Sequence, residues 1–128
     1  MKYKVLIAHP MHDRPLQTQH PDVEIHDLAS EENKYEALLD VIADYDGLLA
    51  KDHLVDKRLL DQATNLKIVA NYGVGYDKVD AAYAKQKGIA VSNTPQSTSI
   101  VTANFTMGLI LSLLRKIVTT DRWIRQGG

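Results

Sequence analysis

Short apolar runs and amphipathic stretches alternate along the first three quarters of this chain. The apolar runs have the length of buried strands, and the second of them alternates apolar and polar positions as an edge strand does. They are Tyr3–Ala8, Val23–Leu28, Gly47–Ala50, Leu66–Ala70 and Ile89–Val91. Because helical segments separate the later runs, the pattern predicts a doubly wound, parallel α/β sheet of about five strands with helices on both faces.

Three helical segments are predicted between the last four strands. The first begins at Ser30, whose hydroxyl can cap a helix, and two acidic residues follow in the first turn, where they favour the positive end of the helix dipole. The second runs from Asp56 to Ala63, and the third ends at Gly88, which suits the left-handed position after a helix. In the first segment, apolar residues at i, i+3, i+4 and i+7 predict one buried face ending near Asp44: Tyr35, Leu38, Leu39 and Ile42.

The last segment, from Ser99 to Gln126, has no proline and a single glycine, which predicts one long helix. Two neighbouring apolar stripes run along it. One stripe holds Ile100, Ala103, Met107, Ile110, Leu111, Leu114, Ile117 and Val118, and the other holds Val101, Phe105, Leu109 and Leu113. One small sheet covers only one side of such a helix, so we expect a further surface to cover the rest. The chain thus divides into a sheet domain, residues 1–98, and a helical segment, residues 99–128.

A glycine turn, Gly73-Val74-Gly75, follows the strand that begins at Leu66, and backbone amides in such a turn can face an anion. Together with Lys78 the turn reads Gly-x-Gly-x-x-Lys, which is similar to a dinucleotide fingerprint. However, Lys78 replaces the third glycine, and no acidic residue ends the next strand. The residues therefore favour an amide nest for an anion, with a dinucleotide site or a plain tight turn as the alternatives.

Few other side chains are candidates for chemistry. His9 and His12 follow the first strand, but Pro10 argues against a helix that would pair them, so a surface loop is favoured over a metal or catalytic site. Lys51 follows the third strand at the same sheet edge, where it either steers an anionic substrate or is an ordinary surface lysine. The remaining histidines are expected to be solvated: His20, His26 and His53.

Composition excludes several classes of protein. The formal net charge of -1 gives no reason to expect nucleic acid or an acidic membrane as a partner, and without cysteine there is no disulfide or thiolate chemistry. The N-terminal apolar stretch is too short for a signal peptide, and Phe105–Leu114 is too short to span a bilayer, so we expect a soluble, cytoplasmic protein. Ala8 and Ala50 end two strands where a receiver domain needs acidic residues, and His9–Met11 cannot serve as the phosphate loop of a flavodoxin.

Several motifs between Leu48 and the end of the chain occur together in one known family. They are Asp56-Lys-Arg-Leu-Leu60, Asn65-Leu-Lys-Ile-Val69, Gly73-Val-Gly-Tyr-Asp-Lys-Val-Asp80, Lys87-Gly-Ile-Ala-Val91, Asn93-Thr-Pro95, Leu113-Leu-Arg-Lys116 and Arg125-Gln-Gly-Gly128. In these motifs the chain resembles the N-terminal half of the D-isomer-specific 2-hydroxyacid dehydrogenases, close to their glyoxylate/hydroxypyruvate reductase branch. The residues before Leu48 resemble the family only in their pattern.

The resemblance implies a flavodoxin-like substrate domain with a long, protruding C-terminal helix, joined in the whole enzyme to a Rossmann domain that binds NAD or NADP. It implies that the amides of Val74 and Gly75, next to Gly73, hold the carboxylate of a small 2-oxo or 2-hydroxy acid. The loop that ends at Thr102 would close the cleft and bring Thr102 near the nicotinamide. The helix over residues 99–126 would form the interface of a homodimer.

Two departures from the family bear on function. Asn104 stands where the family usually has an acidic residue, for which we expect a modest effect near the hinge. The chain also ends where the family's Rossmann domain would begin, so it holds no dinucleotide fingerprint, substrate-binding arginine or Glu–His acid/base pair. We therefore expect the isolated chain to bind no cofactor and to be inactive as a dehydrogenase. The alternative is a non-catalytic dimerising or regulatory module of the same fold.

Overall fold

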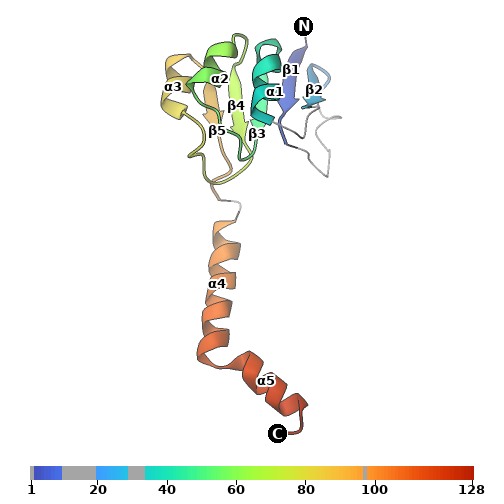
Figure 1. Ribbon diagram of the computed structural model, residues 1–128, viewed down its shortest axis with the longest axis vertical. Helices are drawn as coiled ribbons and strands as arrows, with labels where there is room; N and C mark the ends of the chain where they lie inside the picture. The colour runs from blue at the N-terminus through green and yellow to red at the C-terminus, as the bar shows by residue number, and fades with distance from the viewer. Residues whose placement is uncertain (1, 10–19, 29–33, 97) are drawn as a thin grey trace. The chain divides into compact units, whose positions relative to one another are not determined.

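The computed structural model describes residues 2–9, 20–28, 34–96 and 98–128 (Figure 1). The strands are β1 (Tyr3–Ile7), β2 (Val23–Asp27), β3 (Gly47–Ala50), β4 (Ile68–Asn71) and β5 (Ala90–Ser92). The helices are α1 (Lys34–Val41), the 3-10 turn η2 (Ile42–Asp44), α2 (Lys57–Gln62), α3 (Ala81–Gln86), α4 (Ser99–Leu114) and α5 (Ile117–Arg125). The chain falls into two compact units, Met1–Thr94 and Pro95–Gly128.

All five strands of the first unit are parallel, in the order β2-β1-β3-β4-β5. This is the flavodoxin-like strand order, so the predicted parallel sheet is confirmed, with β2 as an edge strand. The direction of the strand order reverses at β1, which lies between β2 and β3. In open α/β sheets, ligands bind outside the carboxyl ends of the strands at such a switch point.

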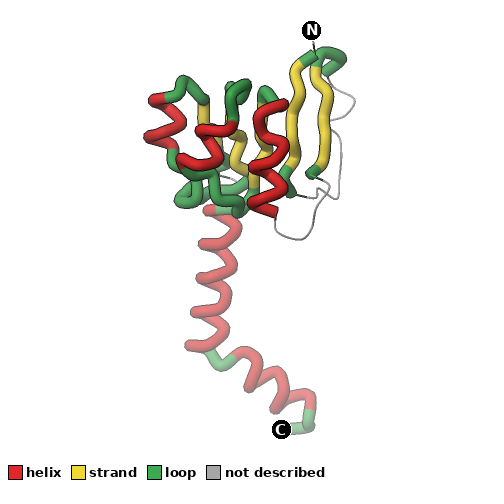
Figure 2. Tube along the Cα trace, turned by 45° about the horizontal axis from the view of Figure 1, so that its top comes forward, coloured by secondary structure: helices red, strands yellow, loops and turns green. Residues whose placement is uncertain are grey.

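The hydrophobic core lies between the sheet and one layer of helices. Leu6, Leu48 and Val69 share one row across β1, β3 and β4 and are almost fully buried. The helices α1, α2 and α3 lie side by side over this face (Figures 1 and 2), because each right-handed crossover moves the chain the same way across the sheet. The predicted helical stripe packs into this core, with Tyr35 partly buried and Leu38, Leu39 and Ile42 buried.

The opposite face of the sheet is more open. Ile68 of β4 is 42% exposed there, and Val5 of β1, in the same row, is only partly buried. The sequence predicts helices on both faces, and within the first unit the helices that the structure describes cover one of them.

Two of the predicted helix ends are set by the residues that the sequence singles out. Asp56 caps α2, and its carboxylate accepts a hydrogen bond from the Leu59 amide at 3.0 Å. Gly88, two residues after α3, has φ +75°, the left-handed conformation that glycine adopts without steric cost. The start of the first helix at Ser30 lies outside the described residues.

The prediction of one long helix from Ser99 to Gln126 is wrong. The segment forms two helices, α4 and α5, with a bend of 58° between them. Lys116 lies between them at φ 53°, in the left-handed region, and its amide donates to the Leu113 carbonyl at 3.1 Å. A right-handed helix cannot pass through a left-handed residue, so the first helix ends here.

Both C-terminal helices are rich in exposed apolar side chains. No residue of α4 is buried, although half of a typical helix surface would be covered in a core. Among the residues that the structure describes, no single helix is long and apolar enough to cross a membrane. The bent pair of α4 and α5 meets the criteria of length and composition only when the two are taken together.

Candidate functional site

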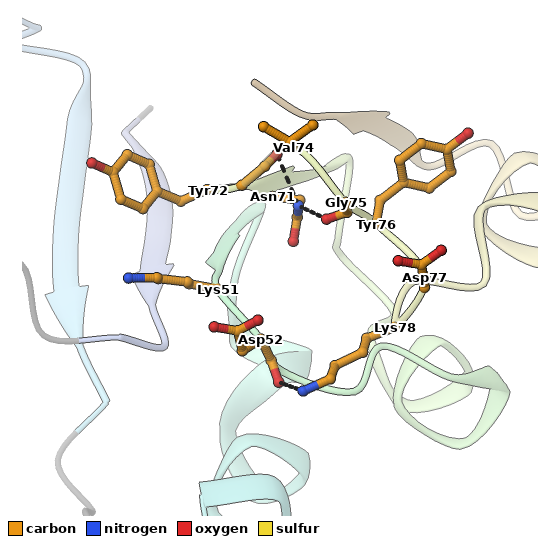
Figure 3. Close-up of a pocket in the computed structure, with 10 residues that line it drawn as sticks. Lys51, Asp52, Asn71, Tyr72, Val74, Gly75, Tyr76, Asp77 and Lys78 are labelled. Atoms are coloured by element: carbon orange, nitrogen blue, oxygen red, sulfur yellow. Dashed lines mark hydrogen bonds between the residues drawn. The ribbon is translucent and has the colours of Figure 1, made fainter. Parts of the chain in front are cut away.

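The loop after β4 forms most of the wall of a cavity at the carboxyl ends of β3 and β4 (Figure 3). The cavity has a volume of about 290 Å³. Its lining residues come from the end of β3 and from the loop: Lys51, Asp52, Asn71, Tyr72, Gly73, Val74, Gly75, Tyr76, Asp77 and Lys78. The structure thus brings together four residues that the sequence proposes for substrate binding, namely Gly73, Val74, Gly75 and Lys51.

The carbonyl groups of the glycine turn are tied down by two asparagine side chains. Asn71 Nδ2 donates to the Gly75 carbonyl at 2.8 Å and to the Gly73 carbonyl at 3.3 Å. Asn93 Nδ2, from beyond β5, donates to the Val74 carbonyl at 2.8 Å. Three consecutive peptide groups are therefore held by side chains at the ends of two neighbouring strands.

The bound carbonyls determine where the amides point. In a planar trans peptide the N–H lies opposite to the C=O, so fixing the Gly73 and Val74 carbonyls turns the amides of Val74 and Gly75 away from the asparagines. Within the described part of the chain, these two amides have no hydrogen-bond acceptor. Two adjacent, unsatisfied N–H donors in a loop can bind an anion such as a carboxylate.

Neither glycine of this turn has a left-handed backbone, because the φ angle is not positive at Gly73 or Gly75. A Cβ atom on Gly73 would make only ordinary contacts, whereas one on Gly75 would lie 3.1 Å from Asp77 Oδ2, which is tighter than nine in ten real contacts of this kind. A side chain at Gly75 would therefore move the Asp77 carboxylate in the cavity wall.

Two lysines and two aspartates add charge to this cavity. Lys78, which stands in place of the third glycine of a fingerprint, donates from Nζ to the backbone carbonyl of Asp52 at 2.9 Å. Asp52 itself has φ 58°, uncommon for a residue with a side chain. Lys51 Nζ lies 5.8 Å from the centre of the Tyr72 ring, within the range of a cation–π contact.

A second cavity, of about 350 Å³, shares Lys51 and Asp52 with the first. Its other lining residues are His9, Lys34, Tyr35, His53 and Leu54. The expectation that His53 is solvated is wrong, because this side chain is partly buried and burial is the main cause that lowers its pKa. His26 is likewise not simply solvated, since it contacts Glu24 Oε1 at 2.8 Å and the Tyr45 hydroxyl at 3.0 Å.

Three further candidates from the sequence are Thr102, His12 and His9. Thr102 belongs to the second unit, where its carbonyl accepts a hydrogen bond from Thr106 Oγ1 at 2.8 Å. His12 lies outside the described residues, and His9 lines the second cavity. Among the residues with a described placement, no group of three or more His, Asp or Glu side chains is arranged to hold a metal ion.

The glycine turn does not fit a dinucleotide. The helix that would receive a pyrophosphate, α3, begins at Ala81, and its N-terminus is already capped by the Asp80 carboxylate, which accepts from the Tyr83 amide at 2.9 Å. A carboxylate at this end of the helix repels the phosphates that a fingerprint binds there. Asp77 adds a second negative charge to the same loop.

Sequence reasoning gave no role to Asn71 or Asn93. Asn71 is only 8% exposed and is the one buried polar residue among those that the structure describes. A signal for both was available, because each asparagine stands at the end of a predicted strand beside the glycine turn. Short amides in such positions commonly bond to nearby backbone groups.

The five-stranded parallel sheet with a cavity at its carboxyl edge makes this an α/β domain of the kind that binds ligands outside the carboxyl ends of its strands. The comparison with known families is more specific. Residues 4–123 match the catalytic domain of the D-isomer specific 2-hydroxyacid dehydrogenases, and the chain belongs to this family.

Individual relatives agree with this assignment. A protein of Staphylococcus epidermidis whose name assigns it provisionally to the 2-hydroxyacid dehydrogenases is 50% identical over 74 residues, which are 58% of this chain and 23% of that protein. A crystal structure from Pyrococcus horikoshii is 33% identical with a TM-score of 0.73, covering 99% of this chain and 38% of its own. The NADPH-dependent glyoxylate/hydroxypyruvate reductase of Sinorhizobium meliloti is 29% identical with a TM-score of 0.73, covering 98% and 39% of the two chains. The chain thus spans well under half the length of the proteins it matches.

Proposed function

We propose that this chain is the substrate-binding part of an NAD(P)-dependent 2-hydroxyacid dehydrogenase that acts on a small 2-oxo or 2-hydroxy acid. The observation that carries the proposal is the pair of unsatisfied amides at Val74 and Gly75, fixed by asparagines in a cavity at the sheet's carboxyl edge. Family membership supports the reaction class, and the S. meliloti reductase, described as NADPH-dependent, supports the type of cofactor.

The chain's own residues would bind and orient the acid. Its carboxylate is ionised near neutral pH and would accept hydrogen bonds from the Val74 and Gly75 amides, while the missing side chain at Gly73 leaves the approach open. Lys51 would add an attractive charge at the rim. Because the glycine turn does not fit a dinucleotide, we propose that NAD or NADP is bound by a part of the enzyme beyond these 128 residues, with Thr102 near the nicotinamide.

An NMR titration of the ¹⁵N-labelled chain tests the carboxylate site. We expect lactate and pyruvate to shift the amide signals of Val74 and Gly75 more than those of the rest of the sheet, because only these amides gain a charged acceptor. Lactamide, which has the shape of lactate without its charge, serves as the control and should shift them much less. Equal shifts with lactate and lactamide, or shifts only at other residues, would contradict the proposal.

The isolated chain should not turn over NADH with glyoxylate, hydroxypyruvate or pyruvate. The glycine turn does not fit a dinucleotide, because the Asp80 carboxylate caps the helix that follows it, so we expect hydride transfer to need a cofactor site supplied by further protein. The measurement is NADH absorbance with rigorously purified chain at high concentration. Steady turnover that co-purifies with the chain would overturn this expectation.

A non-catalytic dimerising or regulatory module is the second candidate. It is favoured by α4, whose exposed apolar side chains are suited to pairing with another surface. The carboxylate titration separates the two candidates, because a module that only dimerises has no reason to keep an anion site at Val74 and Gly75. A reading frame that continues past Gly128 into a glycine-rich dinucleotide motif would favour the enzyme.

A further inference from the structure

The two cavities at the carboxyl edge of the sheet are joined at Lys51 and Asp52, which line both of them. The first cavity is lined by Val74 and Gly75. The second extends toward His9, directly after β1 and Ala8, and toward Lys34 at the start of α1. It therefore lies on the side of the strand-order reversal between β1 and β3, where α/β sheets bind ligands.

The described lining of the second cavity carries more positive than negative charge. Of these residues, Lys34 and Lys51 are cations, His9 and His53 are titratable, and Asp52 is the one carboxylate. At His53, burial lowers the pKa most, and the hydrogen bond with the Lys51 backbone opposes this effect. Lys34 lowers the pKa of His53 further, and its effect is larger than the opposite effect of Asp52.

Among the residues that the structure describes, the two lysines of this cavity have no carboxylate partner. Lys67 and Lys87 elsewhere in the domain pair with Asp46 and Asp61, but neither Lys34 nor Lys51 forms an ion pair with a described residue. In Figure 3 the Lys51 side chain extends away from Asp77 and Lys78, on the same side as Tyr72. Unpaired ammonium groups in a partly enclosed cavity are suited to an anionic ligand.

Building on the proposed function, we propose that the substrate carries a second anionic group, a carboxylate or a phosphate, that binds in the second cavity between Lys34 and Lys51. The 2-oxo acid carboxylate then binds the amides of Val74 and Gly75, and the chain of the acid passes Lys51, which lines both cavities. A cavity of about 350 Å³ has room for such a group with water around it. This chain would therefore select a dianionic 2-oxo acid over a monoanionic one.

A matched pair of acids tests the inference by isothermal titration or NMR with the 128-residue chain in a low-salt, phosphate-free buffer. The pair is 2-oxoglutarate and 2-oxopentanoate, which have the same carbon chain and differ in the terminal carboxylate. A second pair, 3-phosphonopyruvate and pyruvate, presents a phosphonate instead. We expect the dianion to bind about tenfold more tightly in at least one pair, with the preference shrinking as salt is added.

Lysine variants test whether the preference for the dianionic acid arises in the second cavity. Lys34→Met and Lys51→Met should each bring the affinity ratio of the pair toward one. Because both lysines line this cavity, either variant alone tests it if the other proves unstable. The control is Lys85→Met, which removes the same charge from the last turn of α3, where the helix has returned to the opposite edge of the sheet. The ratio should be unchanged in this control.

The outcomes separate the inference from the proposed function. A preference in the carboxylate pair or in the phosphonate pair, lost in Lys34→Met and Lys51→Met, supports the inference and identifies the anion. Equal affinities within both pairs overturn it and leave carboxylate binding at Val74 and Gly75 intact. A preference that persists in both lysine variants also overturns it. If none of the four acids binds, the inference and the proposed function fail together.

Discussion

At the scale of single residues, one buried asparagine side chain holds the peptide groups of the glycine turn. Asn71 holds the Gly73 and Gly75 carbonyls from a buried position, so its loss frees the peptide groups of the turn. We predict that Asn71→Ala lowers the free energy of unfolding by about 1–2 kcal/mol and weakens pyruvate binding by about tenfold. Chemical denaturation and the NMR titration measure the two effects.

The matched control is Asn65→Ala. Asn65 also donates from Nδ2 to a backbone carbonyl, that of Ala43 at 2.7 Å, but it precedes β4 and so lies at the opposite edge of the sheet from the site. This variant should lose stability without losing affinity for pyruvate. If both variants bind pyruvate equally well, Asn71 supports the fold alone and does not orient the amides.

The environment of Tyr35, which includes a hydrogen bond to Asp56, makes the free energy of unfolding fall as the pH rises in the alkaline range. The Tyr35 hydroxyl donates to Asp56 Oδ1 at 2.6 Å, and burial followed by this bond raises the pKa of Tyr35 to about 12. A tyrosine pKa that is higher in the folded state stabilises the fold fully below the unfolded value of about 10, and this contribution is lost as the pH rises through the folded value.

Tyr35→Phe should therefore flatten the alkaline limb of the stability curve. We predict that the wild-type protein loses on the order of 1 kcal/mol more than the variant between about pH 10 and about pH 12. Urea denaturation across this range measures the difference. Tyr76→Phe is the control, since Tyr76 is exposed and lies in the turn, and it should follow the wild-type curve. Parallel curves for the wild type and Tyr35→Phe would refute the coupling.

At the scale of elements, most of the sheet domain could be predicted from periodicity. The predicted Gly47–Ala50 strand matches β3, and the stripe from Tyr35 to Ile42 packs into the core. These elements are determined by local patterns, because a buried face needs apolar residues at the period of its own structure. The glycine turn was also recognised as a candidate anion site, since its two glycines follow a strand directly.

The break in the C-terminal helix could not be predicted. Arg115 and Lys116 are good helix formers, and neither glycine nor proline marks the bend. The left-handed Lys116 costs about 1–2 kcal/mol locally, and no residue of either helix beside it is buried, so nothing in the sequence or the packing marks this position. The strand-end positions of Asn71 and Asn93 are a signal in the sequence, but the carbonyls that these side chains hold depend on which ones the fold brings within reach.

Because of the bend, glycine substitutions at two nearby residues should change the stability of the α4–α5 segment in opposite directions. Lys116→Gly should stabilise the α4–α5 segment by about 1 kcal/mol, because glycine adopts positive φ without steric cost. Thr119→Gly, inside α5, should instead destabilise that helix by about 0.5–1 kcal/mol. Cα chemical shifts over residues 99–125 measure helix content in both variants. A loss of helix content at Lys116→Gly equal to that at Thr119→Gly would show a continuous helix.

At the scale of the whole molecule, the first unit has a cavity at the carboxyl edge of its sheet, and the second has an apolar helix, α4, in which no residue is buried. Both features are understandable if the chain works with further protein, and it spans only 38% of the P. horikoshii structure that it matches. The anion site needs a surface that excludes water from the acid, and α4 needs a surface that covers its apolar stripes. We propose that a second copy of the chain covers α4.

Self-association should depend on one stripe of α4. Phe105, Leu109 and Leu113 are spaced by four residues, so they line one side of the helix, and they are 68%, 51% and 79% exposed. Burying such a side chain contributes about 1.5–3 kcal/mol, so the triple variant F105Q/L109Q/L113Q should raise the dimer dissociation constant by at least about a hundredfold. Sedimentation velocity over a concentration series measures this constant.

A triple variant in α5 is the control, because it removes exposed apolar side chains of similar number and size from the neighbouring helix. I117Q/V118Q/I124Q should leave the dissociation constant within about threefold of the wild-type value, since these residues lie beyond the bend at Lys116. If the α5 variant dissociates the dimer and the α4 variant does not, the interface lies on α5 and not on α4. A wild-type chain that stays monomeric at high micromolar concentration with α4 intact would exclude a dimer through this stripe altogether.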